Sequence, residues 1–230
     1  MRRAVGAAGG FFGGRVTEMC KTTADRLEAA FSLFDAGEWD TSSAIYEALL
    51  SEDGLSPAET AQCLLGYEYV LCALGRYAEA VHVGEKLFEL AASDEERHIA
   101  LHQLAMAKRE AGNYDGALLL IEEERKILDA SFPRDALKYA VNEYEQGYLR
   151  LKLGRLPQAK GRMETSLSYA EQAYDPVARA CAHRGLGEIA IALGQNDAAR
   201  HAFQTAVLLF DQADDLAGAA EIKERWKAFL

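Results

Sequence analysis

The chain has 230 residues, of which 50% are hydrophobic, and a formal net charge of −11. This composition supplies enough apolar material for a sizeable core. The acidic balance disfavours general nucleic-acid binding, which needs clustered Lys and Arg to neutralise phosphates, and we expect no nucleic-acid partner. No uninterrupted apolar run approaches the roughly 18 residues of a membrane span, so we also expect no membrane partner.

The first 18 residues differ from the rest of the chain because glycine and other small residues dominate them. Arg2 and Arg3 precede this stretch as they would in a secretory signal, but glycines interrupt the apolar region and no convincing cleavage site follows. We interpret residues 1–18 as a flexible glycine-rich leader and residues 19–230 as a single domain. The sequence alone leaves open whether the leader is native, cleaved or disordered.

The four cysteines show neither metal-binding nor disulfide spacing; they are Cys20, Cys63, Cys72 and Cys181. None forms a Cys-x-x-Cys pair, and a chain with so much apolar material does not need disulfide staples. We expect reduced cysteines that pack as small apolar residues, which is typical of a cytoplasmic protein.

Five glycines recur through the chain at intervals of 38, 37, 42 and 40 residues; they are Gly37, Gly75, Gly112, Gly154 and Gly194. Self-similarity at such a period is typical of stacked helical repeats. A turn between two antiparallel helices suits glycine, which takes positive φ without strain. Each of these glycines therefore marks the turn of one predicted helical hairpin.

Small residues stand at fixed distances from these glycines, as closely crossing helices require. Most repeats have one seven positions before the glycine: Ala30, Ala105, Gly147 and Gly187. All five have one five positions after it: Ser42, Ala80, Ala117, Ala159 and Ala199. Four positions further on, larger residues would fill the space toward the next hairpin: Tyr46, Ile121, Met163 and Phe203.

This pattern over about residues 22–211 resembles the tetratricopeptide repeat (TPR) family. The first three repeats also carry the family's aromatic residue two positions after the glycine: Trp39, Tyr77 and Tyr114. The later repeats replace it with Leu156 and Asn196, and Glu68 occupies the small-residue position of the second repeat, which puts the helix spacing there in question. The period exceeds the family's usual length of about 34 residues, so we expect longer helices or links.

We therefore predict an all-α fold, a right-handed α-solenoid of about five TPR-like hairpins plus a C-terminal capping helix, with eleven helices in total. Helix starts are predicted at Ser56-Pro57 and Asp175-Pro176, where a capping side chain precedes a proline. The last stretch, residues 216–230, has apolar residues at helical spacing and would cover the open end of the stack.

The resemblance implies that the first helix of each hairpin lines a concave groove. The candidate peptide-binding residues are Phe31, Tyr69, His102, Met106, Arg109, Tyr144, Tyr148, Arg184 and Glu188. This groove would be mostly apolar and aromatic, with isolated charges at Arg109, Arg184 and Glu188. It lacks the lysine and asparagine array that clamps a C-terminal carboxylate in some family members. A helix or an extended peptide with apolar anchors suits it better, unless the aromatic residues belong to the core.

No residue pattern indicates catalysis or a cofactor. His98 and His102 stand four apart on one predicted helix, but no third metal ligand is recognisable, and residue 99 is Ile where a zinc protease needs Glu. Gly185-Leu186-Gly187 lacks the third glycine of a nucleotide loop. We therefore expect no metal, no cofactor and no enzyme activity.

These observations favour a cytoplasmic protein–protein interaction module that binds a peptide or protein segment in its concave groove. One alternative is a ligand- or peptide-responsive regulatory sensor of the bacterial TPR type, although no helix-turn-helix segment is recognisable before the first repeat. Another is a self-associating structural scaffold, a homodimer whose groove holds a second copy. The sequence does not identify the partner.

Overall fold

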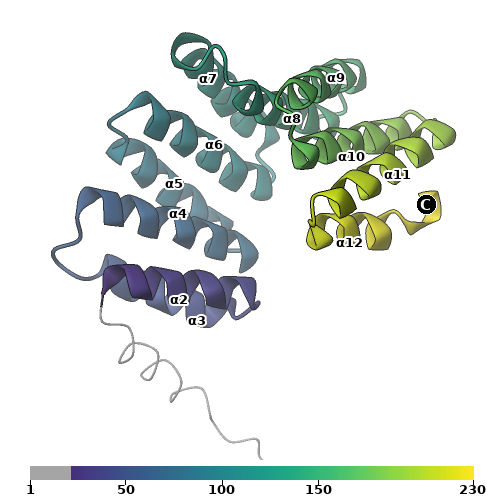
Figure 1. Cartoon of the computed structure of the whole chain (residues 1–230). Helices are drawn as coiled ribbons and strands as arrows, with labels where there is room; N and C mark the ends of the chain where they lie inside the picture. Colours follow the sequence, from purple (N-terminus) through teal and green to yellow (C-terminus); the bar gives the residue numbers. More distant parts are fainter. Residues whose placement is uncertain (1–21) are drawn as a thin grey trace, which may run out of the picture. The chain divides into compact units, whose positions relative to one another are not determined.

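The computed structural model describes residues 22–230, which contain eleven α-helices and no β-strand (Figure 1). Five hairpins follow one another: α2 (Thr23–Asp35) with α3 (Trp39–Leu50), α4 (Pro57–Ala73) with α5 (Tyr77–Leu90), α6 (Asp94–Glu110) with α7 (Tyr114–Ser131), α8 (Ala136–Lys152) with α9 (Leu156–Gln172), and α10 (Pro176–Ala192) with α11 (Asn196–Gln212). Helix α12 (Leu216–Arg225) and the short 3₁₀ helix η1 (Lys227–Phe229) end the chain. The all-α solenoid prediction is confirmed, while the proposed leader lies outside the described residues.

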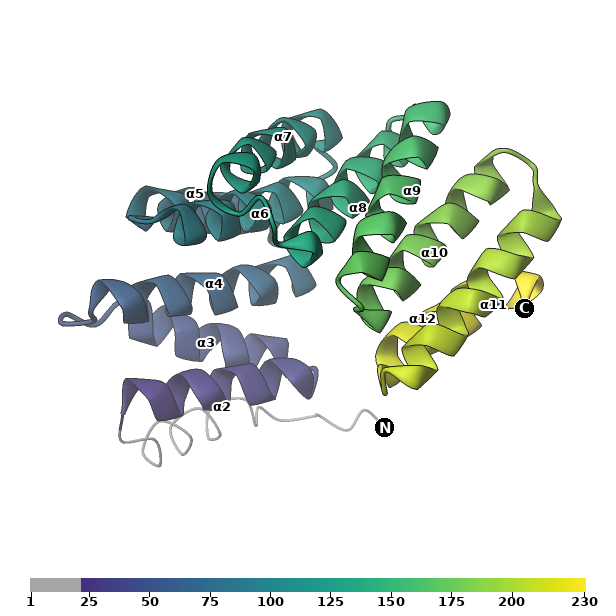
Figure 2. The same cartoon turned by 45° about the horizontal axis from the view of Figure 1, so that its top comes forward.

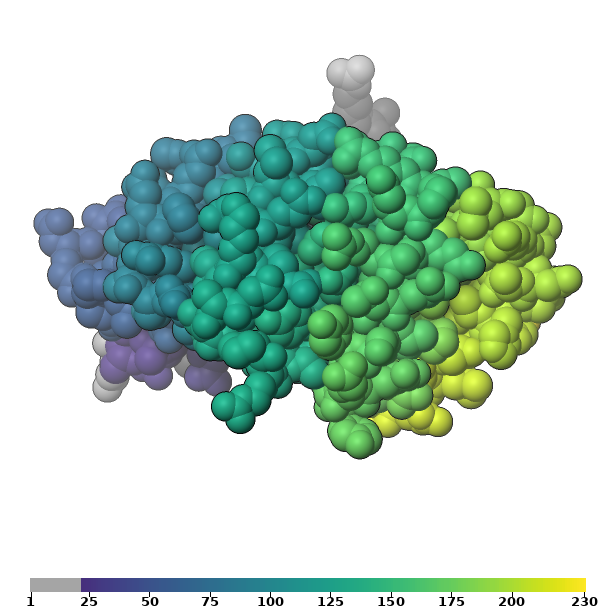
Figure 3. Space-filling model, turned by 90° about the horizontal axis from the view of Figure 1, so that it is seen from above, coloured from purple at the N-terminus to yellow at the C-terminus, as the bar shows by residue number. Residues whose placement is uncertain are grey.

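The chain divides into two compact units, Met1–Glu96 and Arg97–Leu230. In the described part of the first unit, α2 packs on α3, α3 on α4, and α4 on α5. In the second unit, α7 to α12 each pack on the next helix (Figure 2). The space-filling view shows these later helices as neighbouring bands in chain order, from teal to yellow (Figure 3). Within each unit, packing between helices that are consecutive in the chain builds the fold.

The turn inside each hairpin depends on its glycine. All five marker glycines have positive φ, between 72° and 78°. At Gly154, the glycine N–H donates to the Leu151 carbonyl at 3.0 Å and the Arg155 N–H donates to the Arg150 carbonyl at 2.8 Å. The same two bonds recur at the other four turns. This is the Schellman arrangement, in which a left-handed residue satisfies the last carbonyls of a helix.

Two connections between hairpins use the same geometry without glycine. Tyr174, between α9 and α10, has φ 54°, and Asp214, between α11 and α12, has φ 56°. Their following residues repeat the long hydrogen bond, from Asp175 N–H to the Ala170 carbonyl at 3.2 Å and from Asp215 N–H to the Phe210 carbonyl at 3.0 Å. The left-handed conformation costs an L-residue about 1–2 kcal/mol, so these turns are strained relative to the glycine turns.

Side-chain caps begin the helices where the sequence predicts them. Ser56 and Glu59 form a reciprocal capping box at α4, whose first residue is proline. Asp175 accepts a hydrogen bond from the Ala178 N–H at the start of α10. These bonds satisfy amide groups that the first helical turn leaves without partners.

Close approach of the two helices in each hairpin explains the small residues. A Cβ added at Gly187 would lie 2.7 Å from the Phe203 ring, and one added at Gly147 would lie 3.1 Å from Met163 Cε. Phe203 and Met163 are fully buried, as predicted for the larger residues. Glu68 does not prevent this packing in the second repeat, because α4 packs along α5 although Glu68 is buried.

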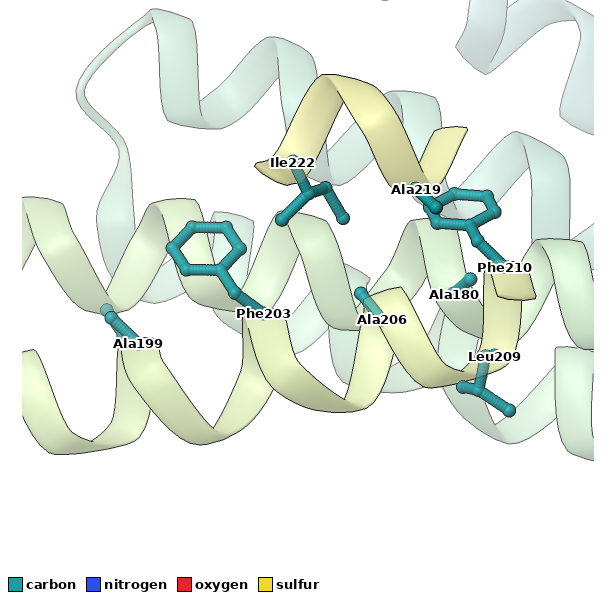
Figure 4. Packing of buried hydrophobic residues seen from close by; sticks show 9 residues of the cluster. Ala180, Ala199, Phe203, Ala206, Leu209, Phe210, Ala219 and Ile222 are labelled. Carbon is teal, nitrogen blue, oxygen red and sulfur yellow. The ribbon is translucent and has the colours of Figure 1, made fainter. Parts of the chain in front are cut away.

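An apolar cluster of α10, α11 and α12 covers the C-terminal end of the second unit. Phe203 and Ile222 are fully buried, and both lie between α11 and α12 (Figure 4). The Trp226 ring stacks on Phe203 with centroids 5.2 Å apart, and Phe229 lies 6.1 Å from the same ring. The prediction of one helix over residues 216–230 is wrong in its last turns, since the α-helix ends at Arg225 and a 3₁₀ turn follows that keeps Phe229 on the cluster.

None of the described helices is long and apolar enough to cross a membrane.

Candidate functional site

The first helices of the hairpins in the second unit, together with the capping helix α12 that follows them in the same position, share a polar and aromatic surface. We call it the first-helix face and define it by residues of α6, α8, α10 and α12: Arg109, Tyr144, Glu145, Tyr148, Lys152, Arg184, Glu188, Glu221 and Arg225. Side-chain contacts between successive first helices hold it together. It contains five of the nine predicted groove residues.

Tyr148 lies between two cations on this face. The Arg109 guanidinium is 5.2 Å from the centre of its ring, and the Lys152 ammonium is 4.9 Å from it. The neighbouring Tyr144 ring stacks on Tyr148 at 6.2 Å with an interplanar angle of 18°. Cation–π attraction and stacking therefore fix the orientation of the half-buried Tyr148 ring.

Arg184 connects three successive first helices. It donates to the Tyr144 hydroxyl on α8 at 2.6 Å and to Glu221 on α12 at 2.7 Å. Arg225 also reaches Glu221, at 3.4 Å. Burial raises the pKa of Tyr144, so this phenol stays protonated and accepts the bond from Arg184 as a neutral group.

Arg109 makes a similar connection from α6 to α8. It donates two hydrogen bonds to Glu145, at 2.9 Å and 2.8 Å, and Glu145 is buried. Both bonds come from one guanidinium nitrogen, Nη1, which lies between the two carboxylate oxygens, and they are charge-assisted. The expectation of isolated charges is wrong for Arg109 and Arg184, because glutamates one repeat further along the chain pair with both.

The positions of these glutamates follow the repeat. Glu145 comes 36 residues after Arg109, and Glu221 comes 37 residues after Arg184. Both spacings are close to one repeat period, so each pair joins nearly equivalent positions of successive first helices. Alignment of the repeats against one another is the signal that would have identified them.

Glu188 differs from the other charges of the face. It is only 8% exposed, and no hydrogen bond or ion pair joins its carboxylate to another described side chain. Burial raises its pKa, although the cations Arg225, Arg184 and Lys152 lie near enough to oppose that effect. It is a buried acid without a direct partner inside the described chain.

His102 lies in a separate cavity of the second unit. The cavity, of about 250 Å³, is lined by parts of α6 and α8 and by Glu124 of α7. Nδ1 of His102 is 3.2 Å from the Glu124 carboxylate, and Asn142 donates to that carboxylate at 2.9 Å. His102 is therefore held by a buried glutamate of its own hairpin.

The two partners shift each other's pKa. Burial opposes protonation of His102, but the hydrogen bond and charge of Glu124 outweigh it and raise the pKa of His102. Burial also opposes ionisation of Glu124, but hydrogen bonds from His102 and Asn142 and the nearby His98 ring outweigh it and lower the pKa of Glu124. The geometry thus favours a buried ion pair at mildly acidic pH.

The paired histidines are not arranged around a metal position. Nδ1 of His98 faces the other Glu124 oxygen at 3.6 Å, while Lys138 Nζ lies 2.9 Å from its Nε2. The Lys138 ammonium therefore lies where a metal ion bound to His98 Nε2 would have to lie. Among residues 22–230, no group of three or more His, Cys, Asp and Glu side chains has the geometry to hold a metal ion.

The remaining predicted groove residues lie elsewhere. Met106 of α6 is half-buried and packs on the apolar cluster between α6, α7 and α8. Phe31 and Tyr69 belong to the first unit, where their side chains are 55% and 47% exposed. The centre of each ring lies 6.4 Å or 6.5 Å, respectively, from the centre of the Phe34 ring. The structure therefore brings together Arg109, Tyr144, Tyr148, Arg184 and Glu188 in one place.

No family model and no curated protein sequence matches the chain. Among solved structures, a thermophilic TPR protein of Thermus thermophilus has a TM-score of 0.64 at 18% identity over 90% of this chain and 98% of its own. A putative kinesin light chain with TPR-like repeats from Podosopora anserina has 0.64 at 16%, over 88% and 98%. PlcR of Bacillus thuringiensis, in complex with the peptide PapR7 and DNA, has 0.69 at 13%, over 90% and 74%. The described chain therefore has the TPR fold.

Proposed function

We propose that the chain is a protein-interaction module that binds a peptide or protein segment across the first-helix face. The observation that carries the proposal is the Tyr148 ring, which is half-buried and fixed between Arg109 and Lys152. Aromatic residues held in this way lose little conformational freedom on binding and often dominate the binding energy. Tyr144 and Arg184 extend the same surface to the next first helix.

A structure with the same fold supports this mode of binding. The PlcR structure is a complex with the peptide PapR7, so a protein of this fold is known with a bound peptide. That structure also contains DNA, but the net charge of −11 weighs against phosphate contacts in the present chain. We therefore retain a peptide or protein partner, no catalytic role, and a cytoplasmic location that suits the free thiols of Cys63, Cys72 and Cys181.

Selection from a random displayed peptide library tests the proposal without a known partner. The wild-type protein should enrich a peptide consensus, and Tyr148→Ala should bind that peptide about tenfold or more weakly, a typical cost of removing an aromatic anchor. Tyr174→Ala is the matched control, because Tyr174 is 89% exposed in the α9–α10 turn. Equal binding by all three proteins would contradict the proposed surface, and a failure to enrich any peptide would contradict the function.

The cavity beside His102 supports a second candidate, a sensor that changes shape on binding. X-ray scattering with and without the selected peptide separates the two, because a sensor must change its overall dimensions. Sedimentation of the free protein tests the scaffold alternative, in which a homodimer fills the face and Tyr148→Glu dissociates it.

A further inference from the structure

We propose that the bound segment places a lysine or arginine side chain against Glu188. The inference rests on the proposed function and names the chemistry of its ligand: a peptide with a basic residue beside an apolar or aromatic anchor. Three features of the face lead to it, and each concerns which of its charges is already paired.

First, Glu188 is a buried carboxylate that lacks a direct partner. The residue is 8% exposed, its carboxylate oxygens still reach the surface, and no described side chain forms a hydrogen bond or an ion pair with it. Buried ionisable groups are normally paired, and removal from water is costly when they are not. An unpaired buried group on a binding surface is therefore a candidate for an incoming partner.

Second, the cations around Glu188 are held by other groups. Arg184 is fixed by the Tyr144 hydroxyl and by Glu221, and Arg225 also contacts Glu221. Lys152 lies over the Tyr148 ring. These contacts keep the three cations near Glu188 without a direct bond to it, which leaves its oxygens available to a donor from outside.

Third, the net charge of the whole protein favours a basic ligand, although the defined face itself carries four cations and three acids. The chain carries a net charge of −11, which attracts basic segments at long range. At the face itself, Glu145 is paired with Arg109 and Glu221 with Arg184, so Glu188 is the remaining acid. A ligand ammonium or guanidinium there would give Glu188 the direct partner that it lacks.

The contacts of Lys152 relate the two parts of the predicted ligand. Lys152 lies over the Tyr148 ring and also acts electrostatically on Glu188. One short segment can therefore place an apolar or aromatic side chain on Tyr148 and a basic side chain on Glu188. The two side chains should occur at a fixed spacing in the peptide sequence.

Parallel library selections on the wild type, Glu188→Gln and Glu171→Gln test this inference. Glu171 is an exposed glutamate at the end of α9, so its variant is a matched control for the loss of one negative charge. The wild type and Glu171→Gln should enrich Lys or Arg at one fixed position, and Glu188→Gln should lose that preference. Glu188→Gln removes no internal ion pair, so its melting temperature should equal or exceed that of the wild type.

A double-mutant cycle with the synthetic consensus peptide completes the test. Replacement of its basic residue by Met should weaken wild-type binding about tenfold, as expected for a buried charge pair, and should leave binding to Glu188→Gln unchanged. Enriched peptides without a conserved basic position, or additive effects in the cycle, would overturn the Glu188 assignment alone. A protonated Glu188 that donates a hydrogen bond to a peptide carbonyl would give the same result, because it would select no basic residue. If no peptide is enriched on the wild type, the proposed function falls together with this inference.

Discussion

The apolar cluster of α10–α12 and the first-helix face share helices α10 and α12 but are stabilised in different ways. Phe203 and Ile222 fill space between closely packed helices and are fully buried. Tyr148 and Arg184 are half-buried and are held by charges from neighbouring repeats. The difference teaches that the repeat pattern encodes helix packing, whereas the proposed binding surface uses positions that the pattern leaves free. Substitutions in the cluster should therefore reduce stability, and substitutions on the face should reduce binding.

The largest expected effect is in the cluster. Phe203→Ala should lower the free energy of unfolding by about 3–5 kcal/mol, because it removes a fully buried ring on which Trp226 stacks. Leu208→Ala, on the same helix but 62% exposed, should change it by less than about 0.5 kcal/mol. Urea unfolding measures both changes in the free energy of unfolding. Equal effects would show that the side of α11 that carries Phe203 is not the buried one.

A pair of glycine substitutions tests the close approach of the helices, because the two are expected to change the stability in opposite directions. Gly187→Ala should destabilise by about 1–3 kcal/mol, since its Cβ would lie 2.7 Å from the buried Phe203 ring. Gly161→Ala, in α9, meets no atom within 4 Å and should stabilise by about 0.5–1 kcal/mol through higher helix propensity. Thermal unfolding distinguishes them, and stabilisation by both would contradict the tight α10–α11 contact.

Most of the apolar cluster was predictable from the sequence, because its residues lie at fixed, short distances along the chain from the turn glycine. The distances from Gly194 predict that Gly187 lies at the close crossing of its hairpin and that Phe203 fills space toward the next helix, whereas the contact between Gly187 and Phe203 themselves was not predicted. The pairs on the first-helix face were not predicted, because Arg109 and Arg184 bind residues one repeat away. The isolation of Glu188 depends on where the surrounding cations point, which spacing along the chain does not specify.

The buried pair His102–Glu124 should make stability depend on pH. The pKa of His102 is raised above 6.5, so its contribution is complete below about pH 6.5 and is lost as the pH rises through the folded-state value. The pKa of Glu124 is lowered below 4.5, so its contribution is present above about pH 4.5 and is lost under more acidic conditions.

His102→Gln should therefore destabilise the protein more at pH 5.5 than at pH 8.5 in urea unfolding. His82→Gln is the matched control, because the His82 side chain is 65% exposed and should give little difference at either pH. A His102→Gln effect that is the same at both pH values would show that His102 contributes only as a neutral hydrogen-bonding group.

The smallest expected effect concerns the two kinds of turn. Tyr174→Gly should stabilise by up to about 1 kcal/mol, because glycine adopts φ 54° without the cost that tyrosine has. Gly154→Ala should destabilise by about the same amount, since Gly154 has φ 72°. Melting temperatures of the two variants that shift in the same direction would contradict this account of the turns.

Photo-cross-linking of a library-selected peptide tests binding by the first-helix face most directly. The peptide would carry a photoreactive group in place of its apolar anchor, and mass spectrometry would locate the attachment sites on the protein. The face predicts attachment within α8 and α10, near Tyr148 and Arg184, and loss of attachment in Tyr148→Ala. Attachment within α9 and α11 instead, unchanged by Tyr148→Ala, would contradict it.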